Sequence, residues 1–378
     1  MIINNVKLVL ENEVVHGSLE MQDGEIRAFA ESQSRLPEAM DGEGGWLLPG
    51  LIELHTDNLD KFFTPRPKVD WPAHSAMSSH DALMVASGIT TVLDAVAIGD
   101  VRDGGDRLEN LEKMINAIEE TQKRGVNRAE HRLHLRCELP HHTTLPLFEK
   151  LVQREPVTLV SLMDHSPGQR QFANREKYRE YYQGKYSLTD AQMQQYEEEQ
   201  LALAARWSQP NRESIAALCR ARQIALASHD DATQAHVAES HQLGSVIAEF
   251  PTTFEAAEAS RKHGMNVLMG APNIVRGGSH SGNVAASELA QLGLLDILSS
   301  DYYPASLLDA AFRVADDESN RFTLSQAVKL VTKNPAQALN LQDRGVIGEG
   351  KRADLVLAHR KGNHIHIDHV WRQGKRVF

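Results

Sequence analysis

From residue 50 onward, short apolar runs alternate with longer helical stretches, and this alternation limits the fold more than any other feature of the sequence. The runs are "LIEL" from Leu51, "TTVLDAV" from Thr90, "RLHLRCEL" from Arg132, "VTLVSLMDH" from Val157, "IALASHDD" from Ile224, "SVIAEFP" from Ser245, "NVLMGAPN" from Asn266 and "LLDILSSDY" from Leu294. Strands that alternate with helices are typical of parallel sheets. Eight strand–helix units over roughly 280 residues predict an α/β fold, a (β/α)8 TIM-like barrel with its functional residues at the carboxyl ends of the strands.

The two ends of the chain have a different pattern. Apolar and polar side chains alternate in "MIINNVKLVL", "VVHGSLEM" and "EIRAFAES" at the start, and the tail contains "ADLVLAHR", "HIHIDHVWR" and "GKRVF". This period of two is typical of strands that bury one face. We therefore predict that residues 1–48 and 345–378 form one small β domain, and that residues 49–344 form the barrel.

Residues 171–213 are longer and more polar than a connection between a strand and a helix requires. The segment is predicted to be a polar helical insertion in the barrel. Two interpretations remain open, because such an insertion can be a lid over the functional site or a solvated helical hairpin that only caps the barrel.

The stretch "LPGLIELHTDNLDK" from Leu48 ends an apolar run abruptly in polar residues. The run Leu51–Leu54 has the length of a buried strand, and a Pro-Gly pair marks its start. Since successive strand residues point to opposite faces, His55 and Asp57 are predicted to project in the same direction. An isolated His-x-Asp is more often a polar loop, so the interpretation depends on the other strand ends.

Polar residues end several of the other runs. The predicted metal ligands are His55, Asp57, Glu138, His165, His229 and Asp301. Imidazole and carboxylate groups suit Zn²⁺, with manganese or magnesium as alternatives. The number of ligands exceeds one tetrahedral shell, so one or two ions are expected, with Glu138 as the bridge between two.

Alternatives remain for individual residues of this set. His141 and His142 follow Glu138 closely and compete with it as ligands. Asp301 stands where it could cap a helix instead, because Asp is a preferred residue at that position. Their joint position at the ends of separate strands favours the metal site over unrelated structural roles.

A glycine-containing loop follows the seventh run and is predicted to bind phosphate. Glycines let the backbone approach an anion, and arginine forks match phosphate oxygens. The predicted phosphate-binding residues are Arg276, Gly277, Gly278, Ser279, His280, Ser281, Asn283, Arg66, Lys68 and Arg170. Ordinary surface charge is the alternative for Arg66, Lys68 and Arg170. The sequence contains no phosphate-binding loop of the Walker type.

Two segments resemble the amidohydrolase superfamily. "PGLIELHTD" is similar to its opening Pro-Gly-Leu-Ile-Asp-x-His-x-His motif, and "GVIGEGKRADLVL" is similar to its closing Gly-x-Ile-x-x-Gly-x-x-Ala-Asp-Leu-Val segment. The resemblance implies a metal-dependent hydrolase whose barrel is flanked by a β-sandwich made from both termini. Two departures matter: Asp57 stands where most members have the second His, and Glu138 takes the place of the carboxylated lysine that bridges the metals in many members.

Three further segments narrow the resemblance. "ELHTDNLDKFFTPRPKVDWPAHSAMSSHDA", "LMDHSPGQRQF" and "APNIVRGGSHSGN" resemble a branch of the superfamily that hydrolyses a ribose triphosphate in phosphonate metabolism, in the carbon–phosphorus lyase pathway, and releases diphosphate. This resemblance implies a small-molecule ribose triphosphate as substrate and Asp301 as the general base. An amidohydrolase that cleaves an amide, such as a deacetylase, and a non-catalytic scaffold of the same fold are the alternatives.

Composition excludes several other classes of protein. A formal net charge of −11 argues against a broad nucleic-acid-binding surface. The apolar runs are too short to span a membrane, and the start of the chain lacks the pattern of a signal peptide. The two cysteines, Cys137 and Cys219, form no Cys-x-x-Cys motif, so a disulfide framework is not expected. We expect a cytoplasmic protein, and a homo-oligomer.

Overall fold

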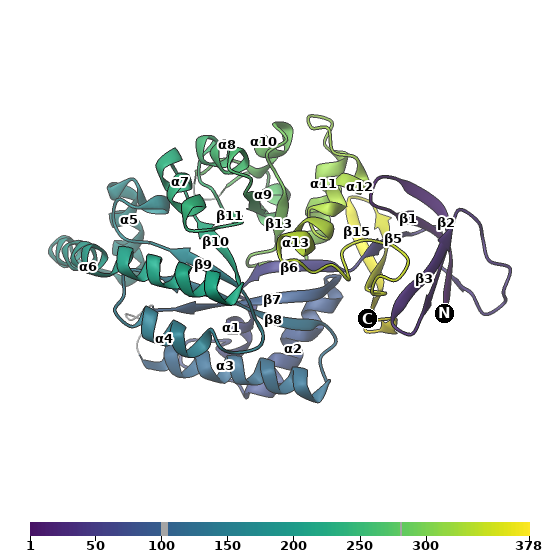
Figure 1. Cartoon of the computed structure of the whole chain (residues 1–378), viewed down its shortest axis with the longest axis horizontal. Helices are drawn as coiled ribbons and strands as arrows, with labels where there is room; N and C mark the ends of the chain where they lie inside the picture. Colours follow the sequence, from purple (N-terminus) through teal and green to yellow (C-terminus); the bar gives the residue numbers. More distant parts are fainter. Residues whose placement is uncertain (100–104, 280–281) are drawn as a thin grey trace. The chain divides into compact units, whose positions relative to one another are not determined.

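A computed structural model describes residues 1–99, 105–279 and 282–378 (Figure 1). The chain divides into two compact units. The first contains Met1–Asp94, Lys113–Arg132 and Met269–Phe378, and the second contains Ala95–Glu112 and Leu133–Leu268. Within the described ranges, no helix has both the length and the apolar character needed to cross a membrane. The predicted domain limits, residues 1–48 with 345–378 and residues 49–344, remain a prediction.

Strands from both ends of the chain form one sheet in the first unit, drawn in purple and yellow in Figure 1. They are β1 Ile2–Val9, β2 Val14–Gln22, β3 Glu25–Ala30, β4 Met40–Asp41, β5 Trp46–Pro49, β14 Leu355–Lys361, β15 His364–Arg372 and β16 Lys375–Arg376. The strand order is β16-β15-β14-β5-β1-β2-β3, with β4 beside β1. Apolar residues that alternate along these strands, including Leu8, Leu19, Leu355 and Trp371, share one core. The predicted pairing of the tail with the N-terminal strands is confirmed.

The other sheet contains the eight predicted strands in sequence order. They are β6 Leu51–Thr56, β7 Ile89–Ile98, β8 Glu130–Glu138, β9 Val157–Met163, β10 Ala225–His229, β11 Ile247–Glu249, β12 Asn266–Gly270 and β13 Ile297–Ser299. Strand β6 pairs in parallel with β7, and parallel pairing also runs from β8 through β12. A bridge joins Thr56 at the end of β6 to Asp301 just after β13. The sheet therefore nearly closes, and the predicted (β/α)8 barrel is confirmed. All six residues of β6 are buried, as expected for a strand covered on both faces.

Helices connect these strands, and threonine or asparagine residues begin several of them. The helices are α1 Asn58–Phe63, α2 Ala73–Ala86, α3 Gly105–Arg124, α4 Thr144–Leu151, η1 Arg170–Phe172, α5 Arg175–Tyr186, α6 Asp190–Arg222, α7 Gln234–Gln242, α8 Phe254–Lys262, α9 Ala271–Arg276, α10 Ala286–Gln291, α11 Ser306–Asp316, α12 Leu324–Lys329 and α13 Lys333–Ala338. The side chains of Thr233 and Thr253 accept hydrogen bonds from the first turns of α7 and α8.

Residues 171–213 contain α5 and most of α6. Asn174 caps α5, and Thr189 begins α6 with a capping box formed with Gln192. Arg175 and Arg179 of α5 both pair with the buried carboxylate of Glu197 on α6. These contacts hold the two helices together, so the polar segment is an ordered pair of helices whose sequence specifies its own ends.

Candidate functional site

Three of the predicted ligands lie where strands of the second unit end. Glu138 is the last residue of β8, His229 is the last residue of β10, and His165 follows β9 by two residues. Strand β9 pairs in parallel with both β8 and β10. Because neighbouring parallel strands end at the same edge of a sheet, these three side chains are brought to one place.

Glu138 and His165 form a close ion pair. Oε2 of Glu138 lies 2.7 Å from Nδ1 of His165, and Oε1 accepts a hydrogen bond of 3.0 Å from the backbone N–H of His165. Burial acts to raise the pKa of Glu138, but the charge and hydrogen bonds of His165 lower it to about 2. Burial likewise acts to lower the pKa of His165, and the charge of Glu138 raises it to about 10. In the absence of a metal ion, the pair is therefore ionised at neutral pH.

A carboxylate that the sequence reasoning missed, Asp230, joins the two histidines. Its Oδ2 lies 3.3 Å from Nε2 of His229 and 3.7 Å from Nε2 of His165. One ligand atom from each of the three residues lies within 4.8 Å of the others, the arrangement that can hold a metal ion. Asp230 has a φ of 57°, a backbone conformation that residues other than glycine rarely adopt and that is over-represented at functional sites.

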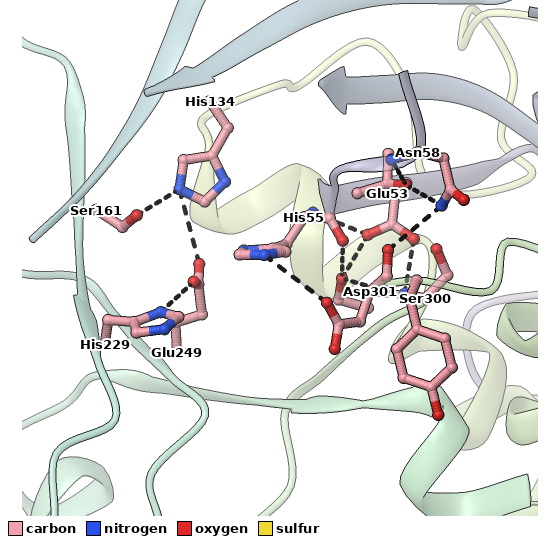
Figure 2. A network of polar contacts seen from close by, with 12 residues as sticks. Glu53, His55, Asn58, His134, Ser161, His229, Glu249, Ser300 and Asp301 are labelled. Carbon is pink, nitrogen blue, oxygen red and sulfur yellow. Dashed lines mark hydrogen bonds and ion pairs between the residues drawn. The ribbon is translucent and has the colours of Figure 1, made fainter. Parts of the chain in front are cut away.

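Glu249 fixes the orientation of His229 from behind (Figure 2). Its buried carboxylate lies 2.7 Å from Nδ1 of His229, which leaves Nε2 on the side of Asp230. The other oxygen of Glu249 lies 3.8 Å from Nε2 of His134, and that nitrogen contacts the hydroxyl of Ser161 at 2.9 Å. A carboxylate behind a histidine sets the tautomer and makes the exposed nitrogen a better ligand for a metal.

The first unit places two other predicted ligands side by side. Nε2 of His55, near the end of β6, lies 3.9 Å from Oδ1 of Asp301 (Figure 2). His55 is buried, whereas the side chain of Asp301 is 35% exposed and can reach a bound ligand. The backbone bridge between Thr56 and Asp301 sets this spacing. Asp301 also has a positive φ, 55°, so it occupies a strained conformation like that of Asp230.

Glu53 ties the two strand ends of the first unit together. One carboxylate oxygen accepts hydrogen bonds from the backbone N–H of His55, at 2.8 Å, and from the hydroxyl of Ser299. The other accepts from the backbone N–H of Ser300 at 2.7 Å. Burial raises the pKa of Glu53. This residue therefore fixes the backbone on both sides of the contact between His55 and Asp301.

Asp57 lies between β6 and α1 and is partly buried. Its neighbour Asn58 donates a hydrogen bond of 2.7 Å to the hydroxyl of Thr56 and a longer one of 3.4 Å to the backbone carbonyl of Asp301. The turn that carries Asp57 is thus attached to the exit of β13. Its role as a metal ligand remains a prediction.

The predicted phosphate loop begins at the end of α9. Arg276 is the last residue of that helix and is exposed, with Nη1 3.5 Å from the hydroxyl of Tyr302. Gly277 ends the helix at a φ of 80°, a conformation that glycine adopts without strain. Gly278, Ser279 and Asn283 follow at partly buried positions. His280 and Ser281 lie outside the residues that the structure describes.

Arg66 and Lys68 are exposed in the turn after α1. A bridge between Arg66 and Val69 closes this turn, and Lys68 has a φ of 64°. Both side chains are accessible to a ligand. Their role as phosphate contacts remains a prediction.

Arg170 differs from the other predicted phosphate contacts because it is buried. Its Nε donates to Asp231 at 3.0 Å, and an Nη donates to Glu239 at 3.3 Å. Asp231 also accepts a hydrogen bond from the hydroxyl of Ser240. A guanidinium held by two carboxylates in the interior favours a structural role, and the phosphate contact of Arg170 remains a prediction.

Asp230, Glu249 and Glu53 were missed for a common reason. Each is a carboxylate within an apolar run or directly after one, at a position that the sequence analysis did not consider for a ligand. A charged group in such a run must have a partner, because burying it alone is costly. That rule singles out Glu53 in "LIEL" and Glu249 in "IAEFP" from the sequence alone.

The donor groups at the strand ends fit a divalent metal ion. Neutral imidazole and carboxylate are the ligands that zinc and related ions prefer, and His229 has the carboxylate behind it that such ligands commonly have. Asp301 is the more exposed member of its pair, and it can accept a proton from a water molecule at its open side. The arrangement is suited to hydrolysis.

Comparisons with known proteins agree with this chemistry. Residues 82–378 match the amidohydrolase family. Over 378 residues, which are 100% of both chains, the sequence is 98% identical to an α-D-ribose 1-methylphosphonate 5-triphosphate diphosphatase of Escherichia coli strain K12.

Solved structures share the fold at low sequence identity. The N-acetyl-D-glucosamine-6-phosphate deacetylase of Mycobacterium smegmatis is 15% identical over 100% of both chains, with a TM-score of 0.64. The 5-methylcytosine deaminase of Klebsiella pneumoniae is 17% identical over 100% of this chain and 98% of that chain, with a TM-score of 0.57. These likenesses support the architecture of the chain.

Proposed function

We propose a reaction for this chain, which belongs to the amidohydrolase family. The protein hydrolyses α-D-ribose 1-methylphosphonate 5-triphosphate to α-D-ribose 1-methylphosphonate 5-phosphate and diphosphate, a step in phosphonate metabolism. Water adds to a phosphorus atom, one phosphoric anhydride bond breaks, and diphosphate leaves. The observation that carries the proposal is the 98% identity, over the full length of both chains, to a protein named for this activity.

The residues proposed to hold metal are His55, Asp57, Glu138, His165, His229 and Asp301, together with Asp230. The grouping of His165, His229 and Asp230 supports this assignment for the second unit. Zinc is the proposed ion, one or two per chain, with manganese or magnesium as alternatives. A bound divalent ion would supply Lewis acidity and lower the pKa of a water molecule toward neutrality.

Asp301 is proposed as the general base. Its carboxylate is the accessible member of the contact with His55, and Glu53 fixes the backbone next to it through Ser299 and Ser300. A carboxylate at this position can accept the proton of the attacking water at an oxygen atom. His55 stays on the buried side and keeps the carboxylate in place.

The loop after α9 is proposed to bind the triphosphate. Its exposed guanidinium, Arg276, can donate charge-assisted hydrogen bonds to phosphate oxygens, and Gly277 and Gly278 leave room for an anion beside the backbone. Arg276→Ala is expected to lower kcat/KM by about tenfold to a hundredfold, since such contacts contribute about 1.5–3 kcal/mol each. Bound metal and melting temperature should stay unchanged; an unaltered kcat/KM would remove the loop from the site.

The amide-cleaving alternative rests on fold alone. The deacetylase of Mycobacterium smegmatis resembles this chain at only 15% identity, which supports a shared architecture and not a shared substrate. None of the site residues described above favours a carbonyl substrate over a phosphoryl one. The scaffold alternative is weaker still, because a candidate ligand group stands at the ends of five of the eight predicted strands.

Phosphorus NMR in H₂¹⁸O tests the reaction directly. The metal-loaded protein is incubated with the ribose triphosphate, and the ³¹P spectrum is followed for diphosphate and the 5-phosphate product. Attack on the phosphorus next to the sugar places ¹⁸O in the 5-phosphate, and attack on the middle phosphorus places it in diphosphate, each visible as an isotope shift. A parallel sample treated with a chelator is the control for the metal.

Two results would contradict the proposal. One is release of orthophosphate in place of diphosphate, and the other is an unchanged triphosphate while an N-acetylated sugar phosphate is cleaved. The expected cytoplasmic location, homo-oligomer and lack of nucleic-acid binding remain predictions.

A further inference from the structure

We propose that Lys185, together with tyrosines of the paired helices α5 and α6, forms a subsite that binds a phosphorus oxyanion of the substrate. The class of ligand rests on the proposed function, since the ribose triphosphate carries such groups at two ends, the triphosphate and the methylphosphonate. The sequence alone predicts the helical segment to be either a lid or a solvated cap. The subsite would give it a direct part in substrate recognition.

A small pocket in the second unit contains both ligand groups and residues of these helices. It has a volume of about 70 Å³. Its lining includes Glu138, His165, Tyr178, Tyr182, Lys185 and Tyr186. The space suits a single phosphate or phosphonate group and not the whole substrate. A group bound there would lie beside the Glu138–His165 pair and opposite a lysine.

Helix α6 is attached to the two loops that carry these ligand groups. The side chain of Asn211, which is buried, donates hydrogen bonds of 2.9 Å to the backbone carbonyls of Leu139 and His141, just after Glu138. Its neighbour Arg212 lies 3.5 Å from the carboxylate of Asp164, the residue before His165. The helix is thus held in a fixed relation to the pocket, as a substrate-binding wall requires.

An aromatic cluster makes this wall rigid. Phe172, Tyr178 and Tyr196 pack with the partly buried Tyr182. Ring centroids lie 4.7 Å apart for Tyr178 and Tyr182 and 5.6 Å apart for Tyr182 and Tyr196. Phe172 also meets the ring of His165 edge-on at 6.2 Å. Packed aromatic rings of this kind contribute a large buried area and preferred ring orientations to the wall.

Lys185 contributes a positive charge to the lining of the pocket. Its side chain is exposed, and its Nζ lies 5.1 Å from the ring of Tyr186 and 5.9 Å from the ring of Tyr182, two other residues of the lining. Tyr182 also lines the pocket, and its phenol hydroxyl can donate a hydrogen bond. An ammonium group and a hydroxyl donor together suit an oxyanion.

A larger groove continues from the pocket along α6. Its volume is about 480 Å³, and its lining shares His141, Tyr196 and Gln200 with the pocket. A ligand with one oxyanion in the pocket can therefore extend its remaining part into the groove.

The test compares Lys185→Met with Lys185→Arg and with Lys177→Met, a control on an exposed lysine of the same helix. Binding of inorganic diphosphate and of methylphosphonate to the metal-loaded proteins is measured separately by calorimetry. Kinetics with the triphosphate, metal content and melting temperature are measured alongside. These two ligands are not hydrolysed, so binding is read independently of the reaction.

Lys185→Met is expected to weaken one of the two ligands, or to lower kcat/KM, by about tenfold to a hundredfold. Loss of diphosphate binding would assign the subsite to the triphosphate end, and loss of methylphosphonate binding would assign it to the other end. Lys185→Arg should retain most of the binding, and Lys177→Met should match the wild type. The wild-type protein could release no diphosphate from the triphosphate while its binding of one of the two ligands still depends on Lys185. That result would overturn the proposed function but not the subsite.

The proposal is overturned if Lys185→Met binds both ligands and turns over the triphosphate as the wild type does. It is also overturned if the only change is a lower melting temperature, because Lys185 would then act only by stacking on the tyrosines.

Discussion

Two clusters in this molecule are built from the same residue types, histidine and carboxylate, but they differ in their access to solvent. The strand-exit cluster contains His165, His229 and Asp230. The buried cluster contains His80, Asp81, Asp94 and His131, in the first unit. Each brings three ligand atoms of histidine and carboxylate within 4.8 Å of one another, so proximity alone does not distinguish them.

In the buried cluster, the carboxylates of Asp81 and Asp94 pair with three of the four ring nitrogens. Asp94 contacts Nε2 of His80 at 2.6 Å and Nδ1 of His131 at 2.8 Å, and the other ring nitrogen of His131 lies 2.8 Å from Asp81. Burial opposes the charge on His131, but Asp94 and Asp81 raise its pKa to about 9. Both nitrogens of this ring are therefore committed to carboxylates, and the cluster is a charged hydrogen-bond network that joins α2, β7 and β8.

Position along the strands explains why the two clusters differ in accessibility. Asp94 lies in the middle of β7 and His131 near the start of β8, and both side chains are fully buried. The strand-exit histidines lie where β9 and β10 end, and the side chain of His165 is 23% exposed. Water and substrate can reach the second place and not the first. The comparison teaches that access at a strand end, more than the set of residues, separates a candidate metal site from a buried polar network.

The largest expected effect comes from breaking the strand-exit cluster. His229→Ala should lower kcat/KM by about a thousandfold or more, on the scale of losing a group that stabilises transition-state charge, and should reduce bound metal with it. Metal analysis and kinetics of the purified variant provide the measurement, with His241→Ala, an exposed histidine of α7, as the control. Full metal content and normal turnover in His229→Ala would remove this residue from the site.

A substitution that breaks the buried cluster should lower the stability of the fold and leave the metal site unchanged. Asp94→Asn leaves the charge of His131 with one carboxylate fewer in the interior, and we expect a loss of about 3 kcal/mol of unfolding free energy. Metal per folded protein should not change. Thermal unfolding is the measurement, and Asp23→Asn in an exposed turn is the control. A normal melting temperature with lost metal would mean that the buried cluster is itself a metal site.

The pH dependence of stability should trace to the buried cluster. His131 has a pKa raised from 6.5 to about 9 in the folded chain. Its contribution is therefore fully present below about pH 6.5 and is lost as the pH rises through 9, roughly 3 kcal/mol in all. The melting temperature should fall between pH 6 and pH 9.5, and less so in Asp94→Asn. Equal falls in both proteins would place the titrating group elsewhere.

The smallest expected effect is a change in metal affinity at the strand-exit cluster. Glu249→Gln keeps the size of the side chain but removes the charge behind His229, so metal affinity should fall by about tenfold, the lower end for groups that orient a ligand. Titration against a metal-buffering chelator measures this affinity. Glu288→Gln on the exposed face of α10 is the matched control. An unchanged affinity would mean that the orientation of His229 is set by packing alone.

The strands were predictable because burial on both faces demands continuous apolar runs, and each run is visible in the sequence. The positions of the candidate ligands at their ends followed from the geometry of a parallel sheet. His55, Glu138 and His229 needed no knowledge of distant partners, since a strand end is defined locally.

The remaining features depend on partners far away in the sequence. Arg170 is a residue type that commonly contacts phosphate, and only the folded chain brings Asp231 to its guanidinium. The buried network of Asp94 and His131 was missed for the same reason. Lys185 lies on a polar helix, where one lysine resembles another until the helix is placed against a pocket.

Strand β5 lies between β1 and β14 in the terminal sheet, so the first strands of the chain pair through it with the last. About 300 residues separate β5 from β14. At a synthesis rate of roughly 5–20 residues per second, the edge of β5 waits on the order of 15 to 60 seconds for its neighbour to leave the ribosome. During that interval a nascent chain exposes an unpaired strand edge, which favours wrong pairing with other chains. The order of these strands thus leaves one edge of β5 without its partner for most of the time that the chain is being synthesised.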